Sequence, residues 1–263
     1  MKIKNLLFIF VISFLFSCKT IIVTNKETTS KIMFKNLMKE SQKIEYASFS
    51  GSFKVTGVKD VPSAYISFKT DVIFNEKKAL FSISILRKTI LEILFNNNNG
   101  ILLNHTKKEF VRFNLEEIDY SKIMGINFNP FEISYLFAGC VPYSDDMQLM
   151  DFKWTKKEYI ITLTNNISKY EIYLDPDYKI VKATINNQFF DKIILESIKY
   201  SKNDDNKDVP NILNFSSEDQ KYKLSFLIEK SSLKKVEIKD ITKDNLEDWK
   251  EVEKIEDIEV KIR

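Results

Sequence analysis

Hydrophobic and polar residues alternate over most of this 263-residue chain, and this period of two is typical of β-strands with one buried face. The alternating segments are separated by short turns, such as Asn-Asn-Asn-Asn-Gly at 96–100, whose residues accept positive φ. Hairpin-length connections favour one antiparallel sheet, so the pattern predicts about eleven strands in meander order in a single domain. The clearest expected strands include 49–55, 64–74, 81–85, 91–95, 159–164, 168–174, 222–228, 236–241 and 258–262.

A segment midway along the chain breaks the alternation and predicts a short, strongly apolar helix. Asn129 is a favourable N-cap and Pro130 suits the first helical position. Gly139 can adopt the left-handed conformation that ends a helix. Helical spacing places three apolar side chains on one face, namely Ile133, Leu136 and Phe137. In an open sheet such a helix either closes the core or contacts a ligand.

The first eighteen residues, MKIKNLLFIFVISFLFSC, have the layout of a secretory signal peptide. The apolar run 6–16 is too short for a membrane-spanning helix, which needs roughly 20 residues. Leu-Phe-Ser-Cys at 15–18 resembles a bacterial lipobox, which implies cleavage before Cys18 and attachment of diacylglycerol to its sulfur. The alternative is an uncleaved or ordinarily cleaved signal with a chance cysteine. We therefore predict a signal peptide at 1–17, a flexible tether at 18–29, a helix at 30–45, and one domain over 30–263.

Composition and motifs argue against several functional classes. The 40 basic and 37 acidic residues nearly balance, so no nucleic-acid partner is implied. His105, the one histidine, falls in a predicted hairpin turn, where we expect it to be exposed, and Cys140 is the only cysteine besides Cys18. A metal site or an intramolecular disulfide is therefore not expected. No nucleophile motif or glycine-rich phosphate loop occurs. We predict no catalytic residue, no metal and no cofactor, and expect the protein not to be an enzyme.

Three segments carry a resemblance to a known family. FSGSFKV at 49–55 is similar to an opening strand, FEISYLFAGCVP at 131–142 to a leucine-rich helix followed by Gly-x-Pro, and LDPDYKIVKA at 174–183 to a hairpin. Together they resemble the LolA and LolB lipoprotein-localisation factors and LolB-like outer-membrane lipoproteins. The resemblance implies a mainly β fold with a few helices: a single curved antiparallel sheet forming an incomplete β-barrel, with helices covering its open side.

The family fold also implies an apolar cavity for acyl chains such as palmitate. The 21 phenylalanines of the chain could line such a cavity, because they offer bulk without polar atoms. The alternative is that the phenylalanine side chains interlock and leave no cavity. The residues expected to line it are Phe53, Phe68, Phe81, Ile83, Ile133, Leu136 and Phe137.

The resemblance further implies a lipoprotein anchored to the membrane through Cys18, whose partners are acyl chains or lipoproteins. It would act in lipoprotein or lipid trafficking at the outer membrane, on its periplasmic face or at the cell surface. Lys19 favours this destination, since the family's inner-membrane retention signal is an aspartate there. An exposed apolar loop residue matters to function in LolB. The alternative is a ligand-free structural or surface-exposed lipoprotein that contacts another envelope protein or a host molecule.

Overall fold

A computed structural model describes residues 26–57, 66–116, 126–202, 208–242 and 244–254. The chain divides into two compact units, Met1–Lys35 and Asn36–Arg263. Helix α2 (Lys26–Gln42) begins four residues before the predicted start at 30, so it includes the end of the expected tether. Lysine and glutamate are good helix formers, which extends the helix beyond its apolar periodicity. The predicted signal peptide and Cys18 lie outside the described residues, as does the expected strand 258–262.

The described residues of the second unit form fourteen strands in one sheet and the predicted midway helix. The first set of strands is β1 (Tyr46–Thr56), β2 (Ile66–Ile73), β3 (Lys78–Ile85), β4 (Lys88–Asn96), β5 (Asn99–Asn104) and β6 (Glu109–Asn114). Helix α4 (Pro130–Phe137) follows. The second set is β7 (Gln148–Trp154), β8 (Tyr159–Thr164), β9 (Ser168–Leu174), β10 (Ile180–Asn187), β11 (Ile193–Lys202), β12 (Asp208–Ser217) and β13 (Lys223–Ser232). A short 3₁₀ turn, Asp244–Leu246, and β14 (Lys250–Glu251) end the described chain.

The strand order shows that the prediction of one continuous meander was wrong. The order is β14-β6-β5-β4-β3-β2-β1-β13-β12-β11-β10-β9-β8-β7, so two meanders meet where β1 pairs with β13. The connection between β6 and β7 runs from the strand next to the edge strand β14 to the opposite edge strand, β7, and carries α4. Residue periodicity identifies strands but not which distant strand each one pairs with, so this long-range pairing was not predictable from the pattern.

One face of the sheet is apolar, as the alternation predicted. In β1, Ala47, Phe49, Phe53 and Val55 are buried while the residues between them are partly exposed. Gly51 stands in the same row, and a Cβ there would lie only 1.9 Å from the carbonyl oxygen of Leu227 on β13. Glycine therefore permits the close approach of the strands that join the two meanders.

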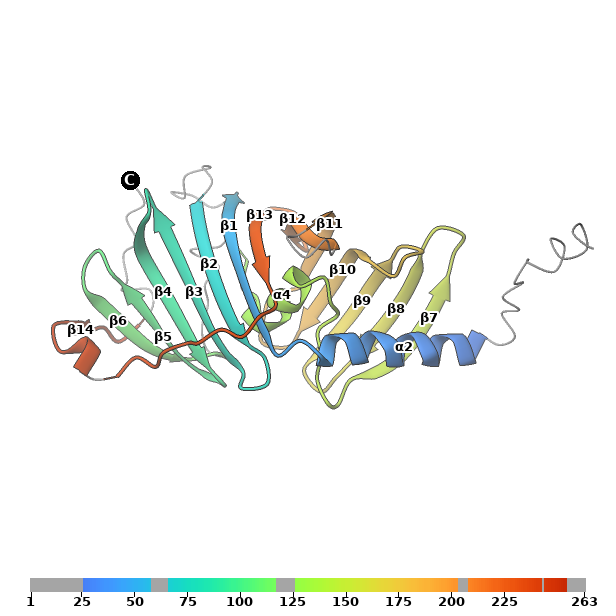
Figure 1. Cartoon of the computed structure of the whole chain (residues 1–263), viewed down its shortest axis with the longest axis horizontal. Helices are drawn as coiled ribbons and strands as arrows, with labels where there is room; N and C mark the ends of the chain where they lie inside the picture. The colour runs from blue at the N-terminus through green and yellow to red at the C-terminus, as the bar shows by residue number, and fades with distance from the viewer. Residues whose placement is uncertain (1–25, 58–65, 117–125, 203–207, 243, 255–263) are drawn as a thin grey trace, which may run out of the picture. The chain divides into compact units, whose positions relative to one another are not determined.

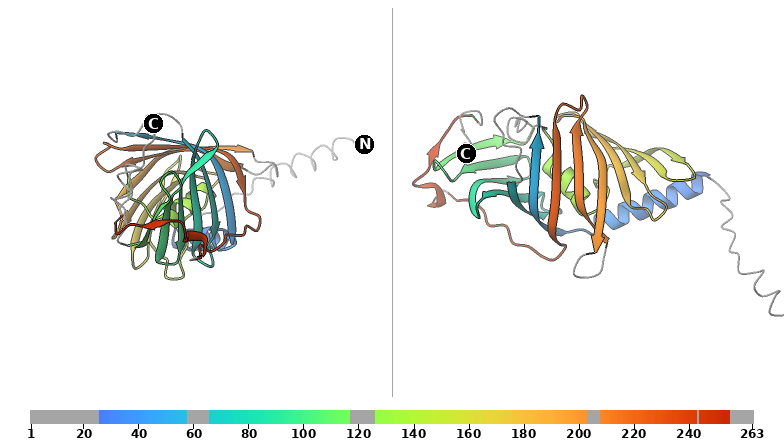
Figure 2. Two further views of the ribbon diagram at one scale, coloured as in Figure 1. Left: turned by 90° about the vertical axis from the view of Figure 1, so that its left-hand side faces the viewer. Right: turned by 90° about the horizontal axis from the view of Figure 1, so that it is seen from above.

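The sheet is strongly curved but not closed within the described residues, where β14 and β7 form its two edges. Figure 1 shows α4 lying on the concave side, within the curve formed by the strands, and Figure 2 shows the same curvature from two further directions. The prediction of a mainly β fold built as an incomplete barrel is confirmed.

The opposite face of β2–β6 is covered by the C-terminal segment. Ile238 and Leu246 are buried there against a cluster that includes Leu94 and Phe110. The segment 236–241 was predicted to be a strand, and that prediction was wrong, because no strand is formed there. Its alternating apolar side chains pack onto the sheet, and its backbone is held instead by Lys78 Nζ, which donates to the Ile238 carbonyl at 2.8 Å.

Candidate functional site

The concave face of the sheet and α4 together enclose the apolar interior of the protein. The helix begins as the sequence predicted: the Asn129 side chain accepts hydrogen bonds from the backbone N–H groups of Phe131 and Glu132 at 2.9 and 3.4 Å. It ends before Gly139, which has a φ of +73°. Every residue from Glu132 to Phe137 is buried. The helix is therefore embedded in the concave side, which suits its mostly apolar sequence.

A cluster of aromatic side chains surrounds Phe137 at the end of α4. Its ring centroid lies 4.8 Å from that of Phe226, 5.6 Å from that of Phe49 and 6.1 Å from that of Phe68. Phe53 joins the cluster through Phe68 and Phe226, at 6.2 and 5.8 Å. These distances fall within the range of favourable aromatic pairs, so the rings pack as a continuous core that links β1, β2 and β13 to α4.

A small apolar cavity remains between α4 and strands β2–β4. Its volume is about 40 Å³, and its walls are almost entirely hydrocarbon. A single water needs roughly 10–15 Å³ on this measure, so the space would hold a few waters but not an acyl chain. Of the predicted cavity residues, Phe81, Ile83, Ile133 and Phe137 line it. The others are buried within the surrounding core and do not line it, namely Phe53, Phe68 and Leu136.

Sequence reasoning missed a buried polar cluster at the first turn of α4. Glu132 Oε1 accepts hydrogen bonds from Ser168 Oγ and Tyr170 OH, both at 2.7 Å, and from Asn187 Nδ2 at 3.1 Å. Burial raises the pKa of the Glu132 carboxyl, and the three hydrogen bonds partly offset that rise. The cluster ties α4 to β9 and β10. Glu132 is 36 to 55 residues away from these three partners in sequence, so the only local signal was an acid in the first helical turn.

Leu86 is a second feature that the sequence did not single out. It lies in the two-residue turn between β3 and β4 and is 96% exposed. Leu86 and its neighbour Arg87 have φ values of +49° and +65°, a conformation in which glycine or asparagine is usually found. A bulky apolar residue is thus held in solvent in a left-handed conformation that costs roughly 1–2 kcal/mol for a residue with a Cβ.

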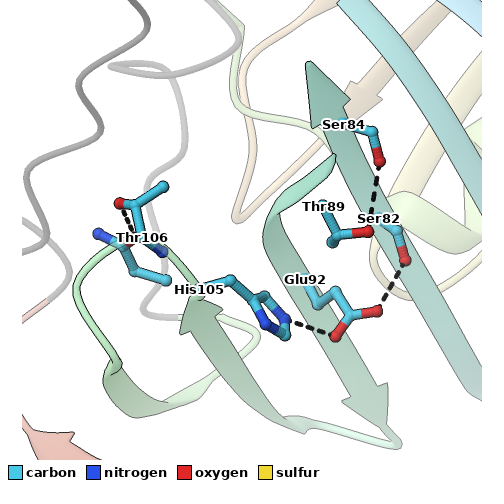
Figure 3. Close-up of polar contacts among 7 residues, drawn as sticks. Ser82, Ser84, Thr89, Glu92, His105 and Thr106 are labelled. Carbon is cyan, nitrogen blue, oxygen red and sulfur yellow. Dashed lines mark hydrogen bonds and ion pairs between the residues drawn. The ribbon is translucent and has the colours of Figure 1, made fainter. Parts of the chain in front are cut away.

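His105 lies in a turn, as predicted, but it is not freely exposed. Its Nε2 is 2.7 Å from Glu92 Oε2, and its ring packs edge-on against Trp249 with centroids 5.1 Å apart. Figure 3 shows that Glu92 stands between His105 and Ser82, whose hydroxyl donates to Glu92 Oε1 at 3.2 Å. The prediction of an exposed histidine was therefore wrong. The imidazole thus contacts the carboxylate of Glu92 and not a serine or threonine hydroxyl that it could activate as a nucleophile.

Neither a metal-binding cluster nor a helix that could cross a membrane is found among the described residues. No group of three or more His, Cys, Asp or Glu side chains in this part of the chain is arranged to hold a metal ion. None of the described helices is both long enough and apolar enough to span a bilayer.

Similarity to known proteins is confined to the three-dimensional fold. No family model and no curated protein matches the sequence. The structure resembles that of a LolA superfamily protein from Nitrosomonas europaea, with a TM-score of 0.54 and 10% identity, over 77% of this chain and 94% of the other. A domain from Vibrio parahaemolyticus, named for outer membrane lipoprotein sorting, is similar over 75% of this chain and 90% of its own length, with a TM-score of 0.49 and 9% identity. The fold is therefore LolA/LolB-like, which confirms the predicted resemblance at the level of architecture.

Proposed function

We propose that this protein is a lipid-anchored envelope lipoprotein that binds acyl chains on the concave side of its sheet, beneath α4. The observation that carries the proposal is the hydrocarbon-walled cavity between α4 and β2–β4. Ile133 and Phe137 of the helix form one wall, and Phe81 and Ile83 of β3 belong to the facing wall. Such walls favour alkyl chains through burial and offer few polar groups to distinguish one lipid from another.

An acyl chain needs more room than the cavity now offers, so ligand entry requires side chains or α4 to move. Each buried methylene contributes about 0.8 kcal/mol, so ten methylenes contribute about 8 kcal/mol. Removing the packing of one buried phenylalanine costs about 3–5 kcal/mol. Burial of a long chain thus exceeds the cost of displacing one ring such as Phe137, whereas burial of a short chain of two or three methylenes, about 1.6–2.4 kcal/mol, does not.

The proposed role is in lipoprotein or lipid trafficking to the outer membrane, with anchoring through Cys18. The LolA/LolB-like fold supports this role by resemblance, and Lys19 supports the outer membrane as its destination. Leu86 has the features of the exposed apolar loop residue that matters in LolB: it is apolar, fully presented to solvent and placed at a hairpin tip. We propose that Leu86 inserts transiently, with the hairpin tip, into an apolar surface, either a membrane or an acylated partner.

The proposed activity is binding rather than catalysis. Glu132 is a buried acidic side chain of α4, and its Oε1 accepts hydrogen bonds from three side chains on β9 and β10. Glu92 and His105 lie on a different part of the sheet and form a partly exposed pair. We interpret Glu132 and its hydrogen bonds as a support for α4. We interpret the Glu92–His105 pair as a link between β4 and the turn after β5.

A second function is favoured by the way the interior is filled. Leu136 and Phe137 are almost completely buried, and the remaining space is only about 40 Å³. These observations also suit a solid β body that holds no ligand and contacts another envelope protein or a host molecule. This structural or surface-exposed lipoprotein is the alternative to the acyl-chain carrier.

Native mass spectrometry and a fluorescent fatty-acid probe distinguish the two functions. The protein is purified from cells without added lipid, and its mass is measured under conditions that preserve non-covalent complexes. Co-purified fatty acid or phospholipid, together with saturable binding of a long-chain probe, supports the carrier. Saturable binding should weaken as the chain is shortened, because the gain from burial falls by about 0.8 kcal/mol per methylene. A consistently empty protein that binds no probe would instead establish the ligand-free body.

A further inference from the structure

Strands β12 and β13 separate in the middle of the sheet. They pair only over Ile212–Ser216 and Lys223–Leu227, next to their shared turn. Beyond that point β12 continues as a partner of β11 as far as Asp208, and β13 continues as a partner of β1 as far as Ser232. Residues 208–211 and 228–232 therefore face each other without a ladder between them. The right-hand view of Figure 2 shows the two neighbouring strands, which diverge away from their turn.

A β-bulge marks each strand where the separation begins. On β12, Lys199 pairs with Ile212 and Tyr200 pairs with Pro210, which leaves Asn211 as the extra residue. On β13 the partners of Ser50 and Gly51 are Lys230 and Ile228, which leaves Glu229 as the extra residue. Bulges bend a strand and increase its twist, so the paired bulges account for the divergence.

The separation leaves a slit of about 590 Å³, far larger than the apolar cavity beneath α4. The register places Lys230 on the same face as Ser50, and Ser231 on the same face as the buried Phe49. Both Lys230 and Ser231 line the slit, so residues from both faces of β13 border it. The other lining residues that matter here are Ser48, Ser50, Lys202 and Asn211.

The polar groups of the slit need both donors and acceptors from an occupant. Asn211 Oδ1 is buried and has no hydrogen-bond partner among the described residues, so it requires a donor. The facing edges of 208–211 and 228–232 carry backbone N–H and C=O groups that are not used in a ladder between β12 and β13. An anion such as phosphate supplies acceptors only, whereas an extended peptide supplies both kinds of group.

The charges of the slit also suit a peptide better than an anion. Lys69 Nζ is 2.6 Å from Asp71, and Lys202 Nζ is 3.0 Å from Asp208. The remaining lysine, Lys230, lies next to Glu229 in the sequence, and both residues line the slit. The walls are therefore close to neutral and carry no excess of positive charge that would select an acidic ligand.

The inner end of the slit lies close to the apolar interior. Ile228 lines the slit, and Phe226, two residues earlier on the same face of β13, lines the cavity beneath α4. Two residues of a strand span about 7 Å. On the other side, Pro210 of β12 lies against Gly139, two residues after the end of α4: a Cβ at that glycine would be 3.2 Å from the proline ring. A ligand whose apolar part lies beneath α4 can therefore have its polar part in the slit.

We infer that the slit between β12 and β13 binds an extended peptide, namely the residues that follow the acylated cysteine of a lipoprotein. This inference rests on the proposed function, which places the acyl chains beneath α4. Strand spacing, sheet thickness and rise per residue give roughly 160 Å³ for each residue of a strand within a sheet, so the slit accommodates about four residues. Main-chain hydrogen bonds to 208–211 and 228–232 would hold the peptide with little dependence on its sequence.

The test compares two ligands in the purified full-length chain. One is S-dipalmitoylglyceryl-cysteine followed by a short uncharged peptide, and the other is S-dipalmitoylglyceryl-cysteine methyl ester without the peptide. Asn211→Leu removes the unpartnered acceptor, and Ser231→Phe fills the slit. Asn214→Leu is the matched control, because Asn214 lies in the paired part of β12 and bonds to Ser197 at 2.9 Å. Thermal melting checks that each variant is folded.

We expect the lipopeptide to bind the wild type about tenfold more tightly than the peptide-free lipid, as for one or two hydrogen bonds to buried groups. Asn211→Leu and Ser231→Phe should remove most of that difference without changing binding of the peptide-free lipid, and Asn214→Leu should change neither. The lipopeptide, but not the peptide-free lipid, should slow amide hydrogen exchange at 228–232. Equal binding of both ligands by the wild type would overturn the peptide site and leave the proposed function intact, whereas binding of neither would overturn both.

Discussion

Truncation of Phe137 measures how completely α4 fills the concave side of the sheet. The Phe137 side chain is 2% exposed and contacts the rings of Phe49, Phe68 and Phe226. These three rings belong to strands β1, β2 and β13; β1 pairs with both of the others, so the strands cannot easily collapse into a void. Buried Phe→Ala substitutions cost about 3–5 kcal/mol, and a rigid surrounding places the cost in the upper half of that range. We therefore expect Phe137→Ala to lower the free energy of unfolding by about 4 kcal/mol.

Urea denaturation followed by tryptophan fluorescence provides the measurement. A loss of about 4 kcal/mol corresponds to a fall in Tm of roughly 8–16 °C for a domain of this size. Phe189→Ala is the matched control, because Phe189 is 38% exposed and its truncation should cost about 1 kcal/mol or less. The void left in Phe137→Ala is lined by hydrocarbon, so a saturating apolar ligand should stabilise the variant more than the wild type.

A small effect would refute this account of the interior. If Phe137→Ala costs less than about 2 kcal/mol with an unchanged m-value, the ring is not packed as the structure shows and the space beneath α4 is already open. If the cost is large but apolar ligands stabilise the variant no more than the wild type, the new void is not accessible to them. That second result would favour the ligand-free body over the carrier.

Three further predictions concern the anchor and two buried groups. Cys18→Ser should leave an uncleaved precursor that no longer partitions with detergent as a lipidated protein; full processing and lipid labelling of the variant would contradict the lipobox. Burial raises the folded-state pKa of Glu132 above its ordinary 4.5, so its protonated form stabilises the fold at low pH and this contribution is lost as the pH rises through and above 4.5. Glu132→Gln should flatten that decline in urea unfolding curves, and an identical pH profile would disprove the assignment. Burial raises the pKa of the Cys140 thiol to about 12, so alkylation at pH 8 should be far slower in the folded chain than in urea, and equal rates would show that the thiol is accessible.

Local chemistry made the elements of this protein predictable. The bounds of α4 follow from Asn129, Pro130 and Gly139, because capping and left-handed conformations depend only on a few neighbouring residues. The apolar face of β1 follows from alternation, because successive side chains of a strand point to opposite faces. Sequence alone thus determined the strand faces, the midway helix and the mainly β class of the fold.

Long-range pairing and packing volumes could be decided only by the tertiary structure. The β1–β13 pairing joins residues about 180 positions apart, and Glu132 meets Asn187 from 55 residues away; neither partner is specified by local periodicity. The alternation at 236–241 is present, but its side chains pack on a sheet whose hydrogen bonds are already formed with other strands. The count of 21 phenylalanines could not show whether the interior is open, because free volume is the small difference between the space enclosed by the backbone and the volume of the side chains that fill it.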